Sequence, residues 1–390
     1  MRCRANADVI FFPVSLRQSS LESTASHKSS YIPTLDGLRA IAFFFVFLAH
    51  TTTASITHLF PQRLGVTLFF FLSGYLITTL LREEAAKTGT ISLKDFYLRR
   101  ALRIFIPMYI AYAAVSLSSL FFSFPVGSLK GFASAIFYYY NYAQMISSHA
   151  TVPPGFSVIW SLSVEEHFYI FFPLLFLLWT KKHLQSETQI RIILSLCVAG
   201  VIWRTYVSLH EFPVLWTYTA TDCRFDSLLW GSLLAIWNNP RFDTPAKFLQ
   251  RRCGLLASLA LAVIAGDFLI RSVVYRDGMR YTVQGIALYF IFYFAIAHPE
   301  HWSVRWLENK QLRYIGWLSY SLYLIHLPIQ IVLHRYLSHT EWLICPICLL
   351  LSLAYAIPLR HWVELPIQRL RARLRHSGPP ISPDLLTKGL

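Results

Sequence analysis

Ten apolar stretches long enough to cross a lipid bilayer recur along the chain, and they restrict its fold more than any other feature. A membrane-spanning helix needs about 20 mainly apolar residues. Charged residues make up 14% of this chain, whereas soluble domains carry about 25%. We therefore expect an all-α, polytopic membrane helix bundle of about ten transmembrane helices. The stretches lie near residues 38–57, 64–81, 104–124, 157–179, 192–209, 222–237, 254–270, 281–297, 314–333 and 342–359.

The positions of the basic residues orient these stretches. Lysine and arginine gather in the cytoplasmic loops of membrane proteins. Here they follow every even-numbered stretch, so we expect both termini to be cytoplasmic; the basic loop 271–280 is an exception. An eleventh candidate, 131–146, would reverse every later loop if it crossed the membrane, so we expect it to be interfacial or re-entrant. The net charge of +15 is then explained by basic residues spread over the cytoplasmic loops. Because these residues are not gathered on one binding face, no nucleic acid partner is expected.

The chain divides into three parts on this basis. Residues 1–30 are polar and serine-rich and are expected to form a disordered extension, residues 31–366 a transmembrane domain, and residues 367–390 a basic cytoplasmic tail. The six cysteines are scattered, and the one pair with metal-like spacing, Cys345 and Cys348, has no histidine or second cysteine pair nearby. We expect buried thiols there and no metal.

Two ionisable residues stand out within the first apolar stretch. Arg39 and His50 are eleven residues apart, and at about 100° per residue their side chains share one face of a helix, roughly 16 Å apart along its axis. An ionisable group in hydrocarbon costs several kcal/mol, so such residues are candidate functional residues. The alternative is an arginine that reaches the interface and a histidine satisfied inside a bundle.

Further ionisable residues are expected at a similar depth in other stretches. His50 and His326 each lie about twelve residues into an outward-running stretch, and Glu165 about eight residues into an inward-running one. At 1.5 Å per residue, all three come to roughly 12 Å from the outer edge of the hydrocarbon layer. Only one of Glu165 and the adjacent Glu166 can face a given partner. Structural hydrogen bonds are the alternative for His326.

Arg224 and Asp226 would lie nearer the outer end of another inward-running stretch. Buried ion pairs that hold a bundle together are a sufficient explanation for both residues.

A histidine in this setting can act as a general base. It can take the proton of a hydroxyl group as that group attacks an activated carbonyl carbon. A nearby carboxylate could orient the imidazole, as in hydrolase triads. The chain has no Gly-x-Ser-x-Gly motif, so we expect direct transfer from a bound donor. Arg99, Arg100 and Arg103 lie at the expected cytoplasmic mouth of the third stretch and suit phosphate groups, although a topological anchor would look the same.

Together these segments resemble the acyltransferase-3 family of integral membrane O-acyltransferases, the O-antigen acetylase group. The resemblance covers about residues 31–366. The segments that carry it are Leu35-Asp36-Gly37-Leu38-Arg39 with His50, 65–77, 99–104 with Pro107, 160–169, Arg224-Phe225-Asp226, 320–326 and Glu364-Leu365-Pro366.

The resemblance implies acyl transfer, usually of acetyl, from cytoplasmic acyl-CoA (acetyl-CoA) to a hydroxyl of a carbohydrate or related acceptor, in a bacterial inner membrane. It implies that Arg39 and His50 are the essential pair and that Glu165 matches the family's glutamate. The 99–103 segment would bind the CoA phosphates. Asp36, His326, Arg224 and Asp226 would support substrate or structure. Only 24 residues follow Pro366 (390 minus 366), so a stand-alone membrane form is expected.

A transporter is the alternative from another functional class. His50, Glu165 and His326 could relay protons or line the path of an acyl donor across the bilayer. Transporters often contain inverted repeats, and no internal repeat is visible in this sequence. The sequence leaves the acceptor open, since nothing in it distinguishes one glycan from another.

Overall fold

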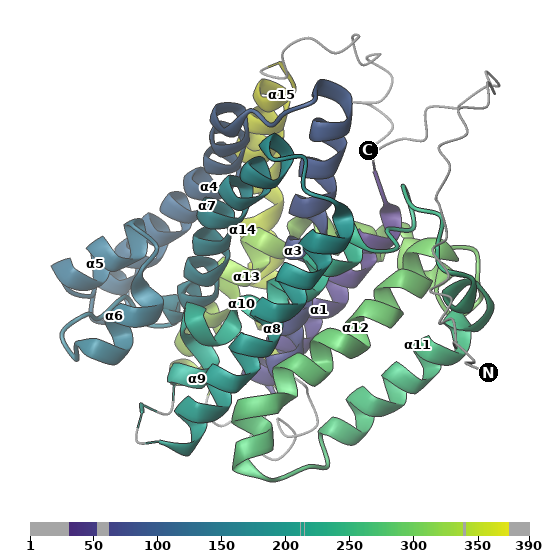
Figure 1. Cartoon of the computed structure of the whole chain (residues 1–390). Helices are drawn as coiled ribbons and strands as arrows, with labels where there is room; N and C mark the ends of the chain where they lie inside the picture. Colours follow the sequence, from purple (N-terminus) through teal and green to yellow (C-terminus); the bar gives the residue numbers. More distant parts are fainter. Residues whose placement is uncertain (1–30, 53–61, 211, 214, 338–340, 374–390) are drawn as a thin grey trace, which may run out of the picture. The chain divides into compact units, whose positions relative to one another are not determined.

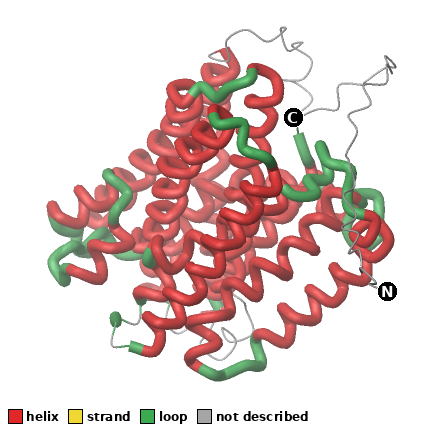
Figure 2. The backbone as a smooth tube through the Cα atoms, viewed as in Figure 1, coloured by secondary structure: helices red, strands yellow, loops and turns green. Residues whose placement is uncertain are grey.

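The computed structural model describes residues 31–52, 62–210, 212–213, 215–337 and 341–373. These residues form helices and loops without any strand (Figure 2), which confirms the all-α prediction. The predicted extension 1–30 and most of the predicted tail, 374–390, lie outside the described residues. The helices are α1 (Pro33–Thr51), α3 (Gln62–Thr88), α4 (Leu93–Phe121), α5 (Leu129–Ile136), α6 (Tyr140–Ile146), η1 (Phe156–Val158), α7 (Ile159–Lys181), α8 (Ser186–Leu209), α9 (Trp216–Thr219), α10 (Thr221–Ile236), α11 (Lys247–Asp267), η2 (Val274–Met279), α12 (Arg280–Ala297), η3 (Arg305–Glu308), α13 (Lys310–Tyr336), α14 (Glu341–Leu359), η4 (Arg360–Glu364) and α15 (Leu365–Arg373).

Nine helical segments in the described part are long and apolar enough to cross a membrane. They correspond to nine of the ten predicted stretches. The remaining stretch, 222–237, is α10, which has 16 residues and is therefore only about 24 Å long. It packs against α3, α7, α8 and α12. A helix surrounded by protein can be shorter than the hydrocarbon layer, because neighbouring helices cover its ends.

The predicted interfacial segment 131–146 consists of two short helices. α5 has eight residues and α6 has seven, so neither is long enough to cross the hydrocarbon layer. α6 packs against α7, and Figure 1 shows both helices beside α4 and α7.

The third long helix, α4, begins eleven residues before the predicted stretch, at Leu93 instead of residue 104 (104 minus 93). The reason is a local cap. The Ser92 hydroxyl accepts a hydrogen bond from the backbone N–H of Asp95 at 3.3 Å, which satisfies an N–H group that the helix itself leaves without a partner. Arg99, Arg100 and Arg103 therefore lie within the helix, not at its mouth.

Close packing of α1 against α13 positions the candidate catalytic residues. Gly316 of α13 allows this approach, because a Cβ atom there would lie 2.0 Å from the carbonyl oxygen of Asp36. Small residues at such contacts let helix backbones approach each other in membranes. Beyond the glycine, a buried apolar cluster joins α1, α13 and α14. Its members are Phe43, Phe47, Leu318, Leu322, Cys348 and Ala356.

Replacing Gly316 with alanine should separate α1 from α13 and lower the melting temperature of the detergent-purified protein. The added methyl group would overlap the backbone of Asp36, and overpacking of this kind costs about 1–3 kcal/mol. Gly266→Ala is the matched control, because a Cβ atom at Gly266 of α11 would have nothing within 4 Å. Equal melting temperatures for the two variants would contradict the tight contact.

Candidate active site

His50 and His326 face each other inside the bundle. The Nδ1 atom of His50, in the last turn of α1, lies 2.9 Å from the Nε2 atom of His326 on α13. Their rings are stacked, with centroids 5.2 Å apart and planes inclined by 28°. His326 is fully buried, and His50 is half-buried. The structure thus brings together two histidines that lie 276 residues apart in the chain.

A small cavity of about 80 Å³ adjoins His50. Three of its walls are the aromatic side chains of Trp160, Tyr218 and Tyr323. Trp160 and Tyr323 lie in segments that resemble the family, but nothing in the sequence alone marks them, or Tyr218, as parts of one cavity. The other lining residues are Val46, Val66, Ser157, Val158 and Leu327.

Glu165 lies one to two helical turns from this cavity, not beside His50 as predicted. Its carboxylate accepts a hydrogen bond from Ser73 Oγ at 2.7 Å. Ser73 is seven residues beyond Val66 on α3 (73 minus 66), which is about 10 Å along the helix axis. The two residues also differ in their place along their helices, since His50 is one residue from the end of α1, whereas Glu165 is six residues from the start of α7 (165 minus 159).

Polar groups without hydrogen-bond partners gather near Glu165. Glu166 and Tyr169 are buried, and the guanidinium of Arg100 lies 3.5 Å from the centroid of the Tyr169 ring. The Glu166 Oε1 atom and the Arg100 Nε atom have no hydrogen-bond partner among the described residues. Buried polar atoms of this kind are rare, and they occur where water, ions or ligands bind.

The other two arginines of α4 differ in their surroundings. Arg99 is half-buried and forms an ion pair of 3.4 Å with Glu84 of α3. Arg103 is exposed. The three arginines therefore do not form a single cluster of equivalent side chains.

At the other end of α1, Arg39 is held by Asp36. Their side chains form an ion pair of 3.2 Å, and Asp36 also accepts a hydrogen bond of 2.8 Å from Trp317 Nε1 of α13. Arg39 and His50 belong to one continuous helix, so the predicted spacing of roughly 16 Å along its axis applies.

Arg224 and Asp226 bind different partners. Asp226 forms a fully buried ion pair of 2.8 Å with Arg204 of α8, whereas Arg224 lies 3.8 Å from the centroid of the Tyr281 ring and donates to Thr67. Arg204 was missed in the sequence, although it could have been found as an arginine within the apolar stretch 192–209. No group of three or more potential ligands suited to a metal ion occurs in the part of the chain that the structure describes.

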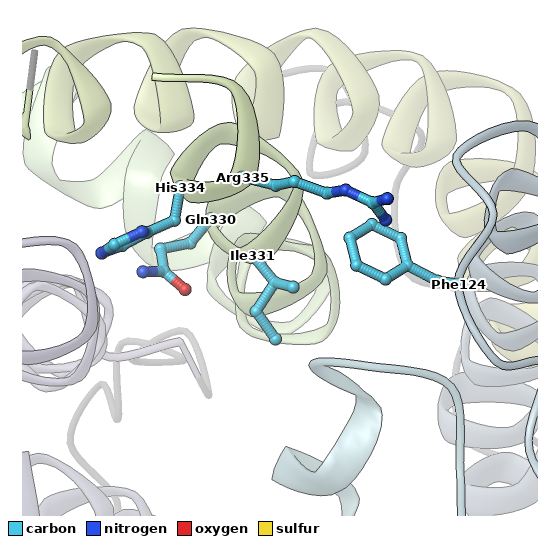
Figure 3. Close-up of a pocket in the computed structure, with 5 residues that line it drawn as sticks. All are labelled: Phe124, Gln330, Ile331, His334 and Arg335. Atoms are coloured by element: carbon cyan, nitrogen blue, oxygen red, sulfur yellow. The ribbon is translucent and has the colours of Figure 1, made fainter. Parts of the chain in front are cut away.

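A larger hollow, of about 530 Å³, lies beside the last turns of α13. Gln330 and His334 line it, one and two turns beyond His326, and Figure 3 shows Arg335 extending over Phe124. The guanidinium lies 4.9 Å from the centroid of that ring. Residues four apart share a helix face, so His326, Gln330 and His334 form one polar line along α13.

Comparisons with known proteins find relatives that are named O-acetyltransferases. The chain is 29% identical to the peptidoglycan O-acetyltransferase OatA of Listeria monocytogenes over 79% of its own length and 51% of that protein. It is 32% identical to the O-acetyltransferase OatA of Staphylococcus aureus over 78% of its length and 52% of that protein. The chain thus spans about half the length of these relatives. No solved structure gives a significant match.

The family comparison covers nearly all of the helical bundle. The family model described as an acyltransferase domain matches residues 32–361, which include both histidines, the aromatic cavity and the α4 arginines. The chain therefore belongs to the acyltransferase-3 family of membrane acyltransferases.

Proposed function

We propose that this protein is a membrane O-acyltransferase that moves an acyl group, most simply acetyl, from acyl-CoA to a hydroxyl of a carbohydrate or glycolipid. The observation that carries the proposal is the His50–His326 contact beside a small, partly aromatic cavity within a membrane bundle. The similarity to proteins named O-acetyltransferases supports the same reaction.

In the proposed reaction His50 is the general base. The acceptor hydroxyl oxygen forms a bond to the thioester carbonyl carbon while its proton passes to the imidazole of His50. The carbon–sulfur bond then breaks, and the departing thiolate takes the proton back from His50. The products are the O-acyl ester and free CoA. Holding the reacting groups of donor and acceptor together at His50 would supply much of the rate enhancement, since it removes the entropy cost of their encounter.

The size of the cavity favours a short acyl group. A cavity of about 80 Å³ has room for a few water molecules only. An acetyl group, with three heavy atoms, suits this space better than a long acyl chain does. Trp160, Tyr218 and Tyr323 would exclude bulk water from the thioester.

We propose that donor and acceptor arrive from opposite sides of the membrane. Arg99 and Arg103 lie in the first half of α4 and would meet the CoA phosphates at the cytoplasmic face. The Arg100 Nε and Glu166 Oε1 atoms, which are buried and without hydrogen-bond partners among the described residues, would suit the amide groups of the pantetheine arm. The 530 Å³ hollow beside Gln330 and His334 would admit the acceptor, with both chain termini in the cytoplasm of a bacterial cell.

Arg103→Gln should weaken use of the donor. We expect the KM for acetyl-CoA to rise about 10-fold with kcat nearly unchanged, because a phosphate contact made equally in ground and transition states affects binding alone. Lys182→Gln, an exposed residue just beyond α7, is the control and should leave KM within twofold. Steady-state kinetics on membranes would measure both, and an unchanged KM for Arg103→Gln would exclude its contact with donor phosphate.

The test of the proposed function is the fate of the thioester. Membranes carrying the protein are given acetyl-CoA labelled in the acetyl group, together with glycan acceptors bearing free hydroxyls. Transfer predicts label in an alkali-labile ester and an equal amount of free CoA. The transporter alternative, which the buried polar atoms of Glu166 and Arg100 favour, predicts that labelled donor crosses sealed vesicles with its thioester intact.

A further inference from the structure

We propose that His326 is a positioning residue that fixes the tautomer of His50, so that Nε2 of His50 is the atom that accepts the proton. The inference rests on the proposed role of His50 as a base. It goes beyond that role by naming the reactive atom and the group that selects it.

The protonation of His326 follows from its neighbours. Its Nδ1 atom lies 2.8 Å from the carbonyl oxygen of Tyr323 and 3.2 Å from that of Leu322. Carbonyl oxygens only accept hydrogen bonds, so Nδ1 of His326 must carry the proton. The opposite tautomer would direct a nitrogen lone pair at two oxygen lone pairs in a fully buried site, where they would repel one another and leave Nδ1 without a donor.

The tautomer of His50 follows from that of His326. In a neutral imidazole with a protonated Nδ1, the Nε2 atom is an acceptor. Nε2 of His326 faces Nδ1 of His50 at 2.9 Å, so Nδ1 of His50 donates. The neutral ring of His50 then has its lone pair on Nε2. A partner at that nitrogen must be a donor, which is what an acceptor hydroxyl provides.

The same contacts support His50 after proton transfer. When Nε2 takes the hydroxyl proton, the ring becomes a cation that still donates through Nδ1 to His326. His326 donates in turn to the two backbone carbonyls, and hydrogen bonds in such a chain polarise one another in a site of low dielectric constant. In hydrolase triads a carboxylate accepts the hydrogen bond from Nδ1 of the catalytic histidine. Here we assign that role to the neutral imidazole of His326, which donates to two helix carbonyls.

Packing holds the ring of His326 in place. Phe43 meets it edge-on, with centroids 6.1 Å apart and planes at 87°, and the Phe47 ring is 6.2 Å away. The side chain of His326 is fully buried. A ring enclosed in this way cannot turn freely, so its two nitrogens keep their separate partners.

The experiment is nitrogen NMR of detergent-solubilised protein labelled with ¹⁵N-histidine. Chemical shifts distinguish protonated from unprotonated ring nitrogens. The two rings are assigned by the signals lost in His50→Gln and His326→Gln. We expect neutral His50 and His326 both to be protonated at Nδ1. A wild-type signal showing His50 protonated at Nε2 would overturn the proposal without any activity measurement.

Two variants test whether His326 is the cause. His326→Leu removes the acceptor, and we expect His50 to shift toward the Nε2-protonated form and kcat to fall about 100-fold with KM within threefold. His326→Gln can place an amide oxygen where Nε2 lies, so it should keep the tautomer and recover at least a tenth of the wild-type kcat. An unchanged His50 tautomer in His326→Leu would exclude the assignment.

These readouts separate the inference from the proposed function. If both histidines show the expected tautomers but no label reaches any hydroxyl acceptor, the positioning holds and the proposed reaction is wrong. If label is transferred while His50 is protonated at Nε2, the reaction holds and the positioning is wrong. Should His326→Leu fail to fold, the wild-type spectrum and the His326→Gln variant still decide the question.

Discussion

His50→Ala is expected to reduce acyl transfer from acetyl-CoA by about 10²–10⁴-fold, the range that general base catalysis contributes. The methyl side chain cannot take the hydroxyl proton, and His326 is too deeply buried to replace it. Donor binding should change little, because the α4 arginines lie elsewhere in the bundle. We therefore expect the loss in kcat, with KM for acetyl-CoA within threefold.

The measurement is transfer of labelled acetyl by membranes matched for protein amount, with melting temperatures to verify folding. His149→Ala is the matched control, because His149 is an exposed loop histidine, and its activity should stay within twofold of wild type. Wild-type turnover by His50→Ala would exclude His50 as the base. Glu165 would then be the next candidate, despite its distance from the cavity.

Asp226→Ala should be the most destabilising of the single substitutions proposed. Asp226 and Arg204 are both fully buried and lie 2.8 Å apart, and Asp226 also accepts a hydrogen bond from Thr282. Removing the carboxylate leaves a guanidinium buried without its counter-charge, which costs about 3–5 kcal/mol. We expect a clear loss of folded protein in detergent and a lower melting temperature.

An exposed ion pair provides the control for this prediction. Glu187 and Arg191 lie 2.6 Å apart, but their side chains are 71% and 73% exposed. Glu187→Ala should change stability by at most about 0.5 kcal/mol, because water screens such a pair. A stable but inactive Asp226→Ala protein would contradict the structural role of Asp226 and would indicate a role in the reaction instead. Replacing Arg204 and Asp226 together with apolar residues should recover stability.

Features that depend on one segment were predictable from the sequence. Nine apolar stretches emerged as long helices, because a backbone in lipid must satisfy its polar groups within the same segment. The relation of Arg39 to His50 was predictable for the same reason, since both belong to one helix with a fixed rise and rotation. The start of α4 also depends on the local sequence alone, because Ser92 caps the helix. The sequence pattern of this cap could have indicated where α4 begins.

Features that depend on two segments were decided by the tertiary structure. The partner of His50 is His326 instead of Glu165, and the partner of Asp226 is Arg204 instead of Arg224. Depth along a helix can be counted from the sequence, but rotation about the axis and the choice of neighbour cannot. Rotation and neighbours depend on how closely the helices pack, and the contact of Gly316 with the backbone of Asp36 is one example. Only the assembled bundle therefore determines which side chains face each other.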